Sequence, residues 1–232
     1  MDFEVRDRAV YLSDIDVLVC ADLHVGKVAT SNVEIGLGER RDLVDRLVSL
    51  CDRYRPREVV VAGDLLHSFG TIPSGVPETV HELRELVGNF ETDVIVTRGN
   101  HDPMLSELWD GNIDDVRRYE FDDGEVVVTH GDDLPQTDAD VYVIGHDHPT
   151  IEIEGRRHPC YLVGRTQYGG ADLLMVPAFG TSVSGVAVNG MSTSDFQSPI
   201  VTDADDLRPI VCDPDGGDAM KFPPLGTFRD LL

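Results

Sequence analysis

Residues that can bind a metal ion follow each of five short apolar runs in this 232-residue sequence. In chain order these residues are Asp22, His24, Asp64, Asn100, His130, His146 and His148. His67 and His101 stand in the same motifs, so that six of the eight histidines occur in these five places. Carboxylates and imidazoles with one amide oxygen and no thiolate suit divalent transition metals, since an all-oxygen magnesium or calcium site would not use so many histidines. We therefore expect two divalent ions as cofactors, Mn²⁺ first, with Fe, Zn, Ni or Mg as alternatives.

Two such ions indicate hydrolysis at phosphorus. Ions held roughly 3.5–4 Å apart bind phosphoryl oxygens together with the attacking hydroxide, and they neutralise the charge that develops in line. A single carboxylate, Asp64, would be the natural bridge between the two ions.

The apolar runs are rich in β-branched residues and do not alternate with polar ones, which is typical of strands buried on both faces. They comprise residues 17–21, 59–62, 94–96, 126–128 and 141–144. Apolar residues recur at helical spacing over residues 43–51 and 80–90, so the order βαβα with right-handed crossovers is predicted. We expect the five runs to form the centre of one layered sheet, with the ligands at its carboxyl edge.

The pattern of apolar residues changes after Pro149. Strand-like pieces at 150–153, 161–163, 173–176 and 183–188 predict a second sheet formed by this half of the chain. Two loops stand out: residues 68–77, which we expect to border a substrate cleft, and residues 189–208, which we expect to be solvated. Inside the motifs, Asp102 and Asp147 are expected to accept hydrogen bonds from nearby backbone groups.

Length and composition favour one domain over residues 1–232, with a motif-bearing half (1–149) and a second-sheet half (150–232). No apolar run approaches the ~18 residues needed to span a bilayer. The first residues do not resemble a signal peptide, and a cytoplasmic protein is expected. The four cysteines are far apart and lack CxxC spacing, so neither a disulfide framework nor a thiolate zinc site is predicted.

The charge balance is strongly acidic. Forty-three acids face 19 bases, giving a net charge of -24, and only Lys27 and Lys221 are lysines. Such self-repulsion is tolerated in high salt, where the Debye length is ~3 Å at 1 M, so the composition favours a halophilic protein. The rival interpretation is an acidic protein with a basic partner. The same balance argues against autonomous electrostatic binding of long nucleic acid.

The ordered motifs Asp-x-His, Gly-Asp-x-x-His, Gly-Asn-His-Asp, His and Gly-His-x-His over residues 22–148 resemble those of the calcineurin-like metallophosphoesterase superfamily. The resemblance implies an α/β fold, a four-layer α/β/β/α sandwich with two mixed sheets. It also implies a ligand assignment. One ion would be held by Asp22, His24 and His148, the other by Asn100, His130 and His146, and Asp64 would bridge them. His101 would protonate the leaving oxygen or steady the phosphoryl group.

His67 stands where the protein phosphatases of the superfamily have aspartate. This is similar to the nuclease-like branch related to Mre11 and SbcD. The stretches at residues 21–27, 63–68 and 176–180 resemble its small stand-alone members, which include the DNA-ligase-associated metallophosphoesterases. With the acidic composition, the resemblance favours a haloarchaeal member.

We therefore expect a phosphodiesterase in which a metal-bound hydroxide attacks a nucleotide-like or nucleic-acid phosphodiester, with His101 and His67 as catalytic residues. Lys27 and Arg40 are the candidate substrate contacts. One alternative is a Mre11-like DNA exonuclease or endonuclease subunit that works with DNA-repair proteins. The alternative from another class is a non-catalytic metal-binding scaffold. The expected binding partner is a phosphoester substrate, such as a nucleotide or single-stranded nucleic acid. We expect no membrane association. The expected oligomeric state is a monomer or homodimer.

Overall fold

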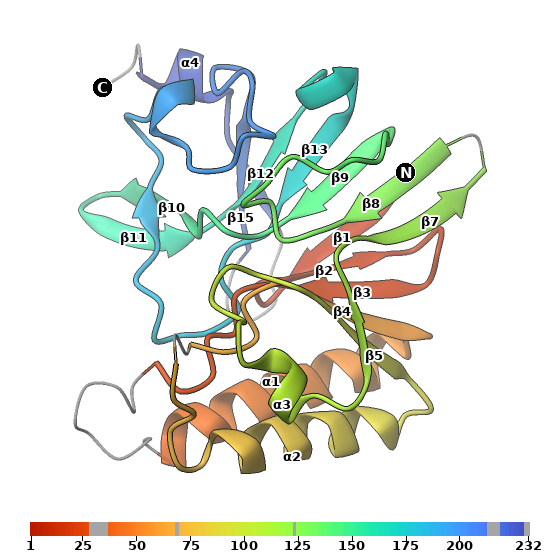
Figure 1. The fold of residues 1–232 in the computed structure, drawn as a ribbon. Helices are drawn as coiled ribbons and strands as arrows, with labels where there is room; N and C mark the ends of the chain where they lie inside the picture. Colours follow the sequence, from red (N-terminus) through yellow and green to blue (C-terminus); the bar gives the residue numbers. More distant parts are fainter. Residues whose placement is uncertain (28–36, 68–69, 123, 213–218, 230–232) are drawn as a thin grey trace.

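The protein is described here by a computed structural model covering residues 1–27, 37–67, 70–122, 124–212 and 219–229. Two large mixed sheets face each other, and two long helices cover the outer face of one of them (Figure 1). The six-stranded sheet has the spatial order β1 (Phe3–Arg6), β2 (Ala9–Leu12), β3 (Val17–Cys20), β4 (Glu58–Ala62), β5 (Asp93–Thr97) and β6 (Asn112–Asp114). The seven-stranded sheet has the order β16 (Met220–Lys221), β15 (Arg208–Val211), β12 (Tyr161–Gly164), β13 (Asp172–Met175), β9 (Val141–Ile144), β8 (Gly124–Val128) and β7 (Arg117–Phe121).

The remaining elements are smaller or lie outside the two sheets. A third sheet contains β11 (Arg156–Pro159), β10 (Pro149–Ile153) and β14 (Val186–Ala187). The helices are α1 (Leu37–Tyr54), α2 (Val76–Gly88), α3 (Leu105–Leu108) and α4 (Leu225–Arg229), with 3-10 turns at Tyr168–Gly170 and Thr193–Asp195. The predicted sandwich of mixed sheets is thereby confirmed.

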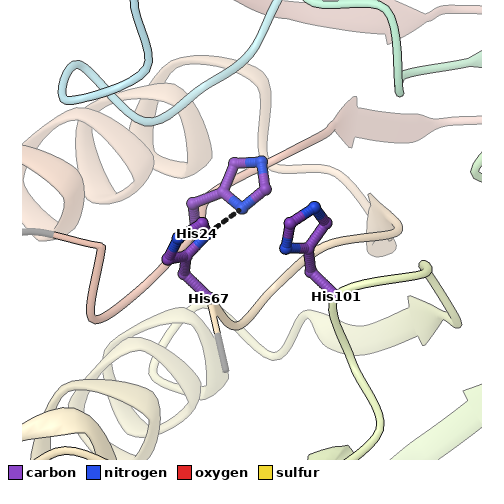
Figure 2. A group of neighbouring side chains, drawn as sticks. All are labelled: His24, His67 and His101. Atoms are coloured by element: carbon purple, nitrogen blue, oxygen red, sulfur yellow. Dashed lines mark hydrogen bonds between the residues drawn. The ribbon is translucent and has the colours of Figure 1, made fainter. Parts of the chain in front are cut away.

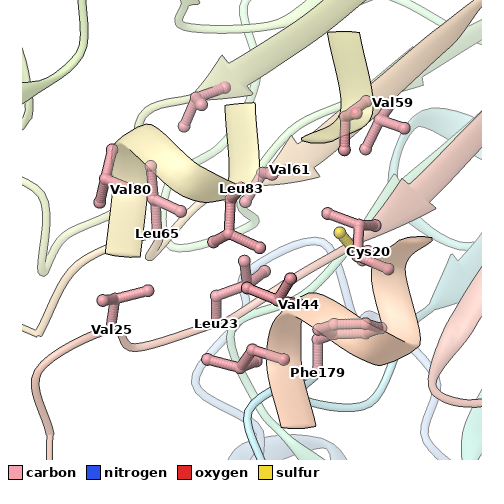
Figure 3. Packing of buried hydrophobic residues seen from close by; sticks show 14 of the residues in the cluster. Cys20, Leu23, Val25, Val44, Val59, Val61, Leu65, Val80, Leu83 and Phe179 are labelled. Atoms are coloured by element: carbon pink, nitrogen blue, oxygen red, sulfur yellow. The ribbon is translucent and has the colours of Figure 1, made fainter. Parts of the chain in front are cut away.

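The strands at the centre of the six-stranded sheet are apolar throughout because both of their faces are buried. In β3, Val17 and Val19 pack between the two large sheets, whereas Leu18 and Cys20 pack toward the helices. This follows from the two-residue period of a strand. Figure 3 shows the helix side, where Val44 of α1 and Leu83 of α2 lie over the sheet. Both predicted helices are confirmed.

The expectation that all five apolar runs share one sheet is wrong. β3, β4 and β5 are parallel neighbours in the six-stranded sheet, whereas β8 and β9 are parallel neighbours in the seven-stranded sheet. Residues 150–232 do not form the second sheet alone, because β7, β8 and β9 belong to it as well. Apolar character reports that a strand is buried on both faces, but it carries no information about which neighbour the strand pairs with.

Residues 189–208 were expected to be a solvated loop, and this too is wrong. Phe196, Ile200, Val201, Ala204 and Leu207 are buried against the outer face of the seven-stranded sheet. Side chains satisfy much of the irregular backbone: Gln167 Oε1 accepts hydrogen bonds from the N–H groups of Thr202 and Asp203. The segment therefore forms part of the sandwich's outer layer, together with the small sheet and α4. Its apolar residues follow no helical or strand period, so no local pattern revealed their burial.

The other expectations concern loops, cysteines and membrane spans. Within residues 68–77, positions 68 and 69 lie outside the described residues, and α2 already begins at Val76. All four cysteines are free thiols, and Cys20, Cys51 and Cys160 are buried. Among the helices of the described ranges, none is long and apolar enough to cross a membrane.

Candidate metal centre

The five ligand-bearing turns meet at one edge of the sandwich. Those after β3, β4 and β5 leave the six-stranded sheet, and those after β8 and β9 leave the seven-stranded sheet. Backbone hydrogen bonds join neighbouring turns: the Asp22 N–H donates to Gly63 O over 3.1 Å, and the His24 N–H donates to Asp64 O over 3.0 Å. The Gly145 N–H donates to His130 O over 3.0 Å. The structure thus brings all seven predicted ligands into one place.

Five of the seven candidate ligands have a left-handed backbone. The φ angles are 55° at Asp22, 48° at His24, 51° at Asp64, 71° at His146 and 48° at His148. For residues other than glycine this conformation is sparsely populated and costs roughly 1–3 kcal/mol each. Such strain clusters at functional sites, where the surrounding structure enforces it.

Two glycines let these turns approach closely. A Cβ atom on Gly99 would lie 2.2 Å from Asp64 Oδ1, and one on Gly145 would lie 2.5 Å from Asp22 Oδ2. Both distances are far below van der Waals contact. The glycines before Asn100 and His146 are therefore needed so that a carboxylate from another strand can lie against the backbone.

A first group of side chains gathers around Asp22. His148 Nε2 lies 3.3 Å from Asp22 Oδ1 and 3.2 Å from His24 Nε2, and His24 Nε2 lies 3.7 Å from Asp64 Oδ2. One ligand atom from each of these four residues lies within 4.8 Å of the ligand atoms of the others. This spacing would allow all four to contact a single ion.

A second group lies on the other side of Asp64. His130 Nε2 is 2.9 Å from Asn100 Oδ1, 3.1 Å from His146 Nδ1 and 3.6 Å from Asp64 Oδ1. Asp64 therefore directs Oδ2 toward the first group and Oδ1 toward the second. A bridging carboxylate would have this orientation.

The electrostatics of the centre fit bound cations. Asp22 is wholly buried, and its Oδ1 makes no well-oriented hydrogen bond among the described residues, although His148 Nε2 lies 3.3 Å away. Burial lowers the pKa of His24 to about 3, which keeps the ring neutral and able to act as a ligand. Burial also raises the pKa of Asp64 to about 7, because the charged form lacks water. A divalent cation would satisfy the Asp22 oxygen and offset the cost of the buried charge on Asp64.

His67 and His101 lie beside His24 of the first group, as Figure 2 shows. Their rings stack with centroids 5.1 Å apart, and His67 Nδ1 lies 3.3 Å from Nδ1 of His24. The His101 N–H donates to Asp64 Oδ1 over 2.8 Å. Burial, followed by the charges of His67 and His130, lowers the pKa of His101 to about 4. His101 is consequently a neutral hydrogen-bonding ring at neutral pH.

The two predicted substrate contacts differ in position. Burial and then the positive charge of Lys27 lower the pKa of His67, which places the Lys27 charge within electrostatic range of the centre. Arg40 lies on α1, where its guanidinium forms an ion pair with Glu82 on α2. This ion pair links α1 to α2.

The two aspartates inside the motifs do accept backbone hydrogen bonds, as predicted. The Asp102 carboxylate is fully buried and accepts from the N–H groups of Leu65, Leu66 and Gly99 at 2.8–3.3 Å. The Asp147 carboxylate accepts from residues distant in sequence, namely the N–H groups of Gln197 at 2.7 Å and Ser198 at 3.0 Å.

Arg46 and Asp132 lie near the centre, although no motif in the sequence pointed to either of them. The Arg46 guanidinium lies 4.2 Å from the Phe179 ring centroid and donates to Phe179 O over 2.7 Å. The next residue, Gly180, donates its N–H to Asp22 O over 3.2 Å.

Asp132 helps to raise the pKa of His130, although burial alone would lower it. Asp132 stands two residues after a candidate ligand, and that proximity is the only local signal for it.

Residues 15–140 match the family described as calcineurin-like phosphoesterases, which is more than half of the chain. The chain belongs to this family. Calcineurin-like phosphoesterases are hydrolases of phosphoesters and typically bind two divalent metals.

Two solved structures align with most of the chain, and the first of them resembles it in fold. The crystal structure of Pseudomonas putida nuclease MPE aligns with a TM-score of 0.61 and 20% identity, covering 90% of this chain and 96% of that one. YfcE, a phosphoesterase from E. coli, aligns with a TM-score of 0.49 and 16% identity, covering 88% and 97%. No curated protein sequence matches the chain.

Proposed function

We propose that this calcineurin-like phosphoesterase is a phosphodiesterase that uses two divalent ions to hydrolyse a nucleotide-like or nucleic-acid substrate. The observation that carries the proposal is the arrangement around Asp64. Its two carboxylate oxygens face two groups of ligand-type side chains, which come from both large sheets.

In this proposal Asp22, His24 and His148 would hold one ion, Asn100, His130 and His146 would hold the other, and Asp64 would serve both. Mn²⁺ suits this mixture of nitrogen and oxygen donors. When bound, such ions lower the pKa of water and neutralise charge at the phosphoryl group. The buried Oδ1 of Asp22 and the short separations between imidazole nitrogens support this assignment.

The chain's own residues would orient the phosphoryl group and the leaving oxygen. With its pKa lowered to about 4, His101 is suited to donate a hydrogen bond from a neutral ring. It would steady a phosphoryl oxygen or the leaving oxygen in this way. His67 stacks on His101 and would restrict the orientation of its ring. Lys27 would add attraction for the anionic substrate from the side of His67.

The narrower assignments belong to the same proposal. Residues 1–232 would act as one domain, because strands from both halves pair in the seven-stranded sheet. His67 favours the branch related to Mre11 and SbcD. The net charge of -24 favours a haloarchaeal protein that works in concentrated salt.

The test is hydrolysis of bis-p-nitrophenyl phosphate and p-nitrophenyl phosphate in multimolar KCl with Mn²⁺. We expect the wild type to cleave the diester in preference to the monoester. Asp64→Asn should lower kcat/KM by more than about a hundredfold, which exceeds the usual effect of changing an outer-shell partner. His101→Ala should lower kcat by about a hundredfold, as is usual for loss of a hydrogen-bond donor that stabilises the transition state.

The matched control is His81→Ala, which removes an exposed imidazole from α2 and should leave both rates unchanged. A folded, Mn²⁺-loaded wild type that cleaves neither ester would contradict the proposal and favour the scaffold alternative. Adding single-stranded DNA as a third substrate tests the nuclease-subunit alternative. Cleavage of DNA together with inertness toward both nitrophenyl esters would favour that alternative.

A further inference from the structure

A cavity of about 490 Å³ lies beside the second ligand group, and the proposed mechanism does not use it. Gly99 and Thr129 line it, and they directly precede the candidate ligands Asn100 and His130. The connection between β6 and β7 and residues 132–137, after β8, form the rest of its wall. Its volume falls within the range of small-molecule sites. The cavity adjoins the second ligand group through these two residues, and the candidate ligands themselves do not line it.

The lining combines an apolar surface with carboxylates. Val116, Leu134 and Pro135 provide apolar area, and the Leu134 side chain is 45% exposed despite its size. Three carboxylates line the cavity, whereas Arg98 is the one cation among its lining residues. These carboxylates belong to Asp115, Asp132 and Asp133.

This charge pattern selects against a continuing nucleic-acid strand. Arg98 already has a carboxylate partner, because its Nε lies 3.9 Å from Asp115 Oδ1. The next phosphate of a strand would meet Asp132 and Asp133, and Arg98 is the one lining cation that could offset both carboxylates. Contact repulsion of this kind is screened by salt less than repulsion between distant surface charges.

A ribonucleoside has the complementary chemistry. Its ribose hydroxyls can donate to carboxylate oxygens, and such charge-assisted hydrogen bonds are stronger than neutral ones. The flat base can lie against Leu134 and Pro135, where Gln136 and Thr137 offer an amide and a hydroxyl to its edge.

We propose that the cavity between Gly99 and residues 132–137 binds a ribonucleoside joined to the scissile phosphate, so that the preferred substrate is a short ribonucleotide diester. This inference rests on the proposed phosphodiesterase function for its kinetic meaning. The binding of a nucleoside to the cavity can be tested without catalysis.

The binding test follows the methyl NMR signals of Leu134 while uridine is added to the wild type. We expect uridine to shift these signals, and 3′-uridine monophosphate to bind about tenfold more weakly because its phosphate meets the carboxylates. Asp133→Asn should weaken uridine binding about tenfold, as expected for loss of a hydrogen bond to a charged group. The control Glu154→Gln removes an exposed carboxylate from the β10–β11 turn and should leave uridine binding unchanged.

Two outcomes of the binding test overturn the proposal. The first is the absence of any uridine-induced shift at Leu134. The second is tighter binding of choline than of uridine, which would identify the cavity as a site for a cationic alcohol.

The kinetic test compares diuridine monophosphate with the same dinucleotide bearing a 3′-terminal phosphate. We expect the extra phosphate to lower kcat/KM at least tenfold in the wild type and less in Asp133→Asn. Equal or faster cleavage of the phosphorylated dinucleotide would overturn the proposal in favour of a strand-binding groove. If uridine shifts Leu134 but no diester is cleaved, the nucleoside site stands and the proposed catalytic function fails.

Discussion

The candidate centre is formed by turns of two sheets that are supported in different ways. On the six-stranded sheet, Asp102 joins the turns after β4 and β5, and α1 and α2 cover the outer face. On the seven-stranded sheet, Asp147 stands between His146 and His148 and is held by the backbone of Gln197 and Ser198. Two of the seven candidate ligands, His146 and His148, therefore depend on an outer segment with little regular structure.

Regular secondary structure is therefore not needed to support a site. The segment at residues 189–207 obtains its order from buried apolar side chains and from hydrogen bonds between side chains and backbone. Burial and satisfied polar groups can stabilise irregular chain as they stabilise a helix.

The largest effect is expected from Asp102→Ala, which should lower the free energy of unfolding by about 5 kcal/mol. Three buried N–H groups would lose their acceptor, at about 1–3 kcal/mol each. Denaturant unfolding monitored by circular dichroism measures the change. Asp102→Asn retains one acceptor oxygen and should be less destabilising, whereas equal losses in the two variants would show that these hydrogen bonds contribute little.

A smaller loss, about 3.5 kcal/mol, is expected for Ile200→Ala in the irregular segment. Ile200 is fully buried, as is Leu47 on the regular helix α1, so Leu47→Ala is the matched control and should cost a similar amount. The same unfolding measurement applies. A change within about 0.5 kcal/mol for Ile200→Ala would be typical of a surface position and would mean that the segment is solvated after all.

The smallest of the three effects is expected for Asp147→Ala, about 2.5 kcal/mol, because two N–H groups rather than three lose their acceptor. Hydrogen exchange should locate the effect. The amides of Gln197 and Ser198 should exchange faster, while those of Leu65 and Leu66, held by Asp102, should keep their protection. Faster exchange in both pairs would indicate that the two sheets share one support.

Much of the fold could be predicted from local patterns. The strands β3, β4, β5, β8 and β9 and the helices α1 and α2 were all predicted, because each buries enough apolar residues to leave a clear signal. The short strands β1, β6, β15 and β16 were not predicted, since they contain polar or exposed residues and are ordered by pairing with a neighbour. The register of a pairing is a long-range property that the residues of one strand do not encode.

The candidate site shows the same division. Asp64 could be identified as a ligand from its motif, but the opposite directions of its two oxygens follow from the packing of the two sheets. Arg40 could not be assigned from sequence, because its partner Glu82 lies 42 positions along the chain on another helix. Charged side chains at a helix start give the same signal whether they bind a substrate or a neighbouring helix.

Residue types and local patterns were enough to predict the chemical composition of the candidate centre, namely carboxylates, imidazoles and one amide at the ends of buried strands. They also predicted a strongly acidic surface. The tertiary structure alone decided which sheet each strand joined, where Asp147 found its partners, and that a cavity opens beside Asn100 and His130. The physical reason is that residue type and local period report burial and donor chemistry. Contacts between distant segments instead depend on how the sheets, helices and irregular chain pack together.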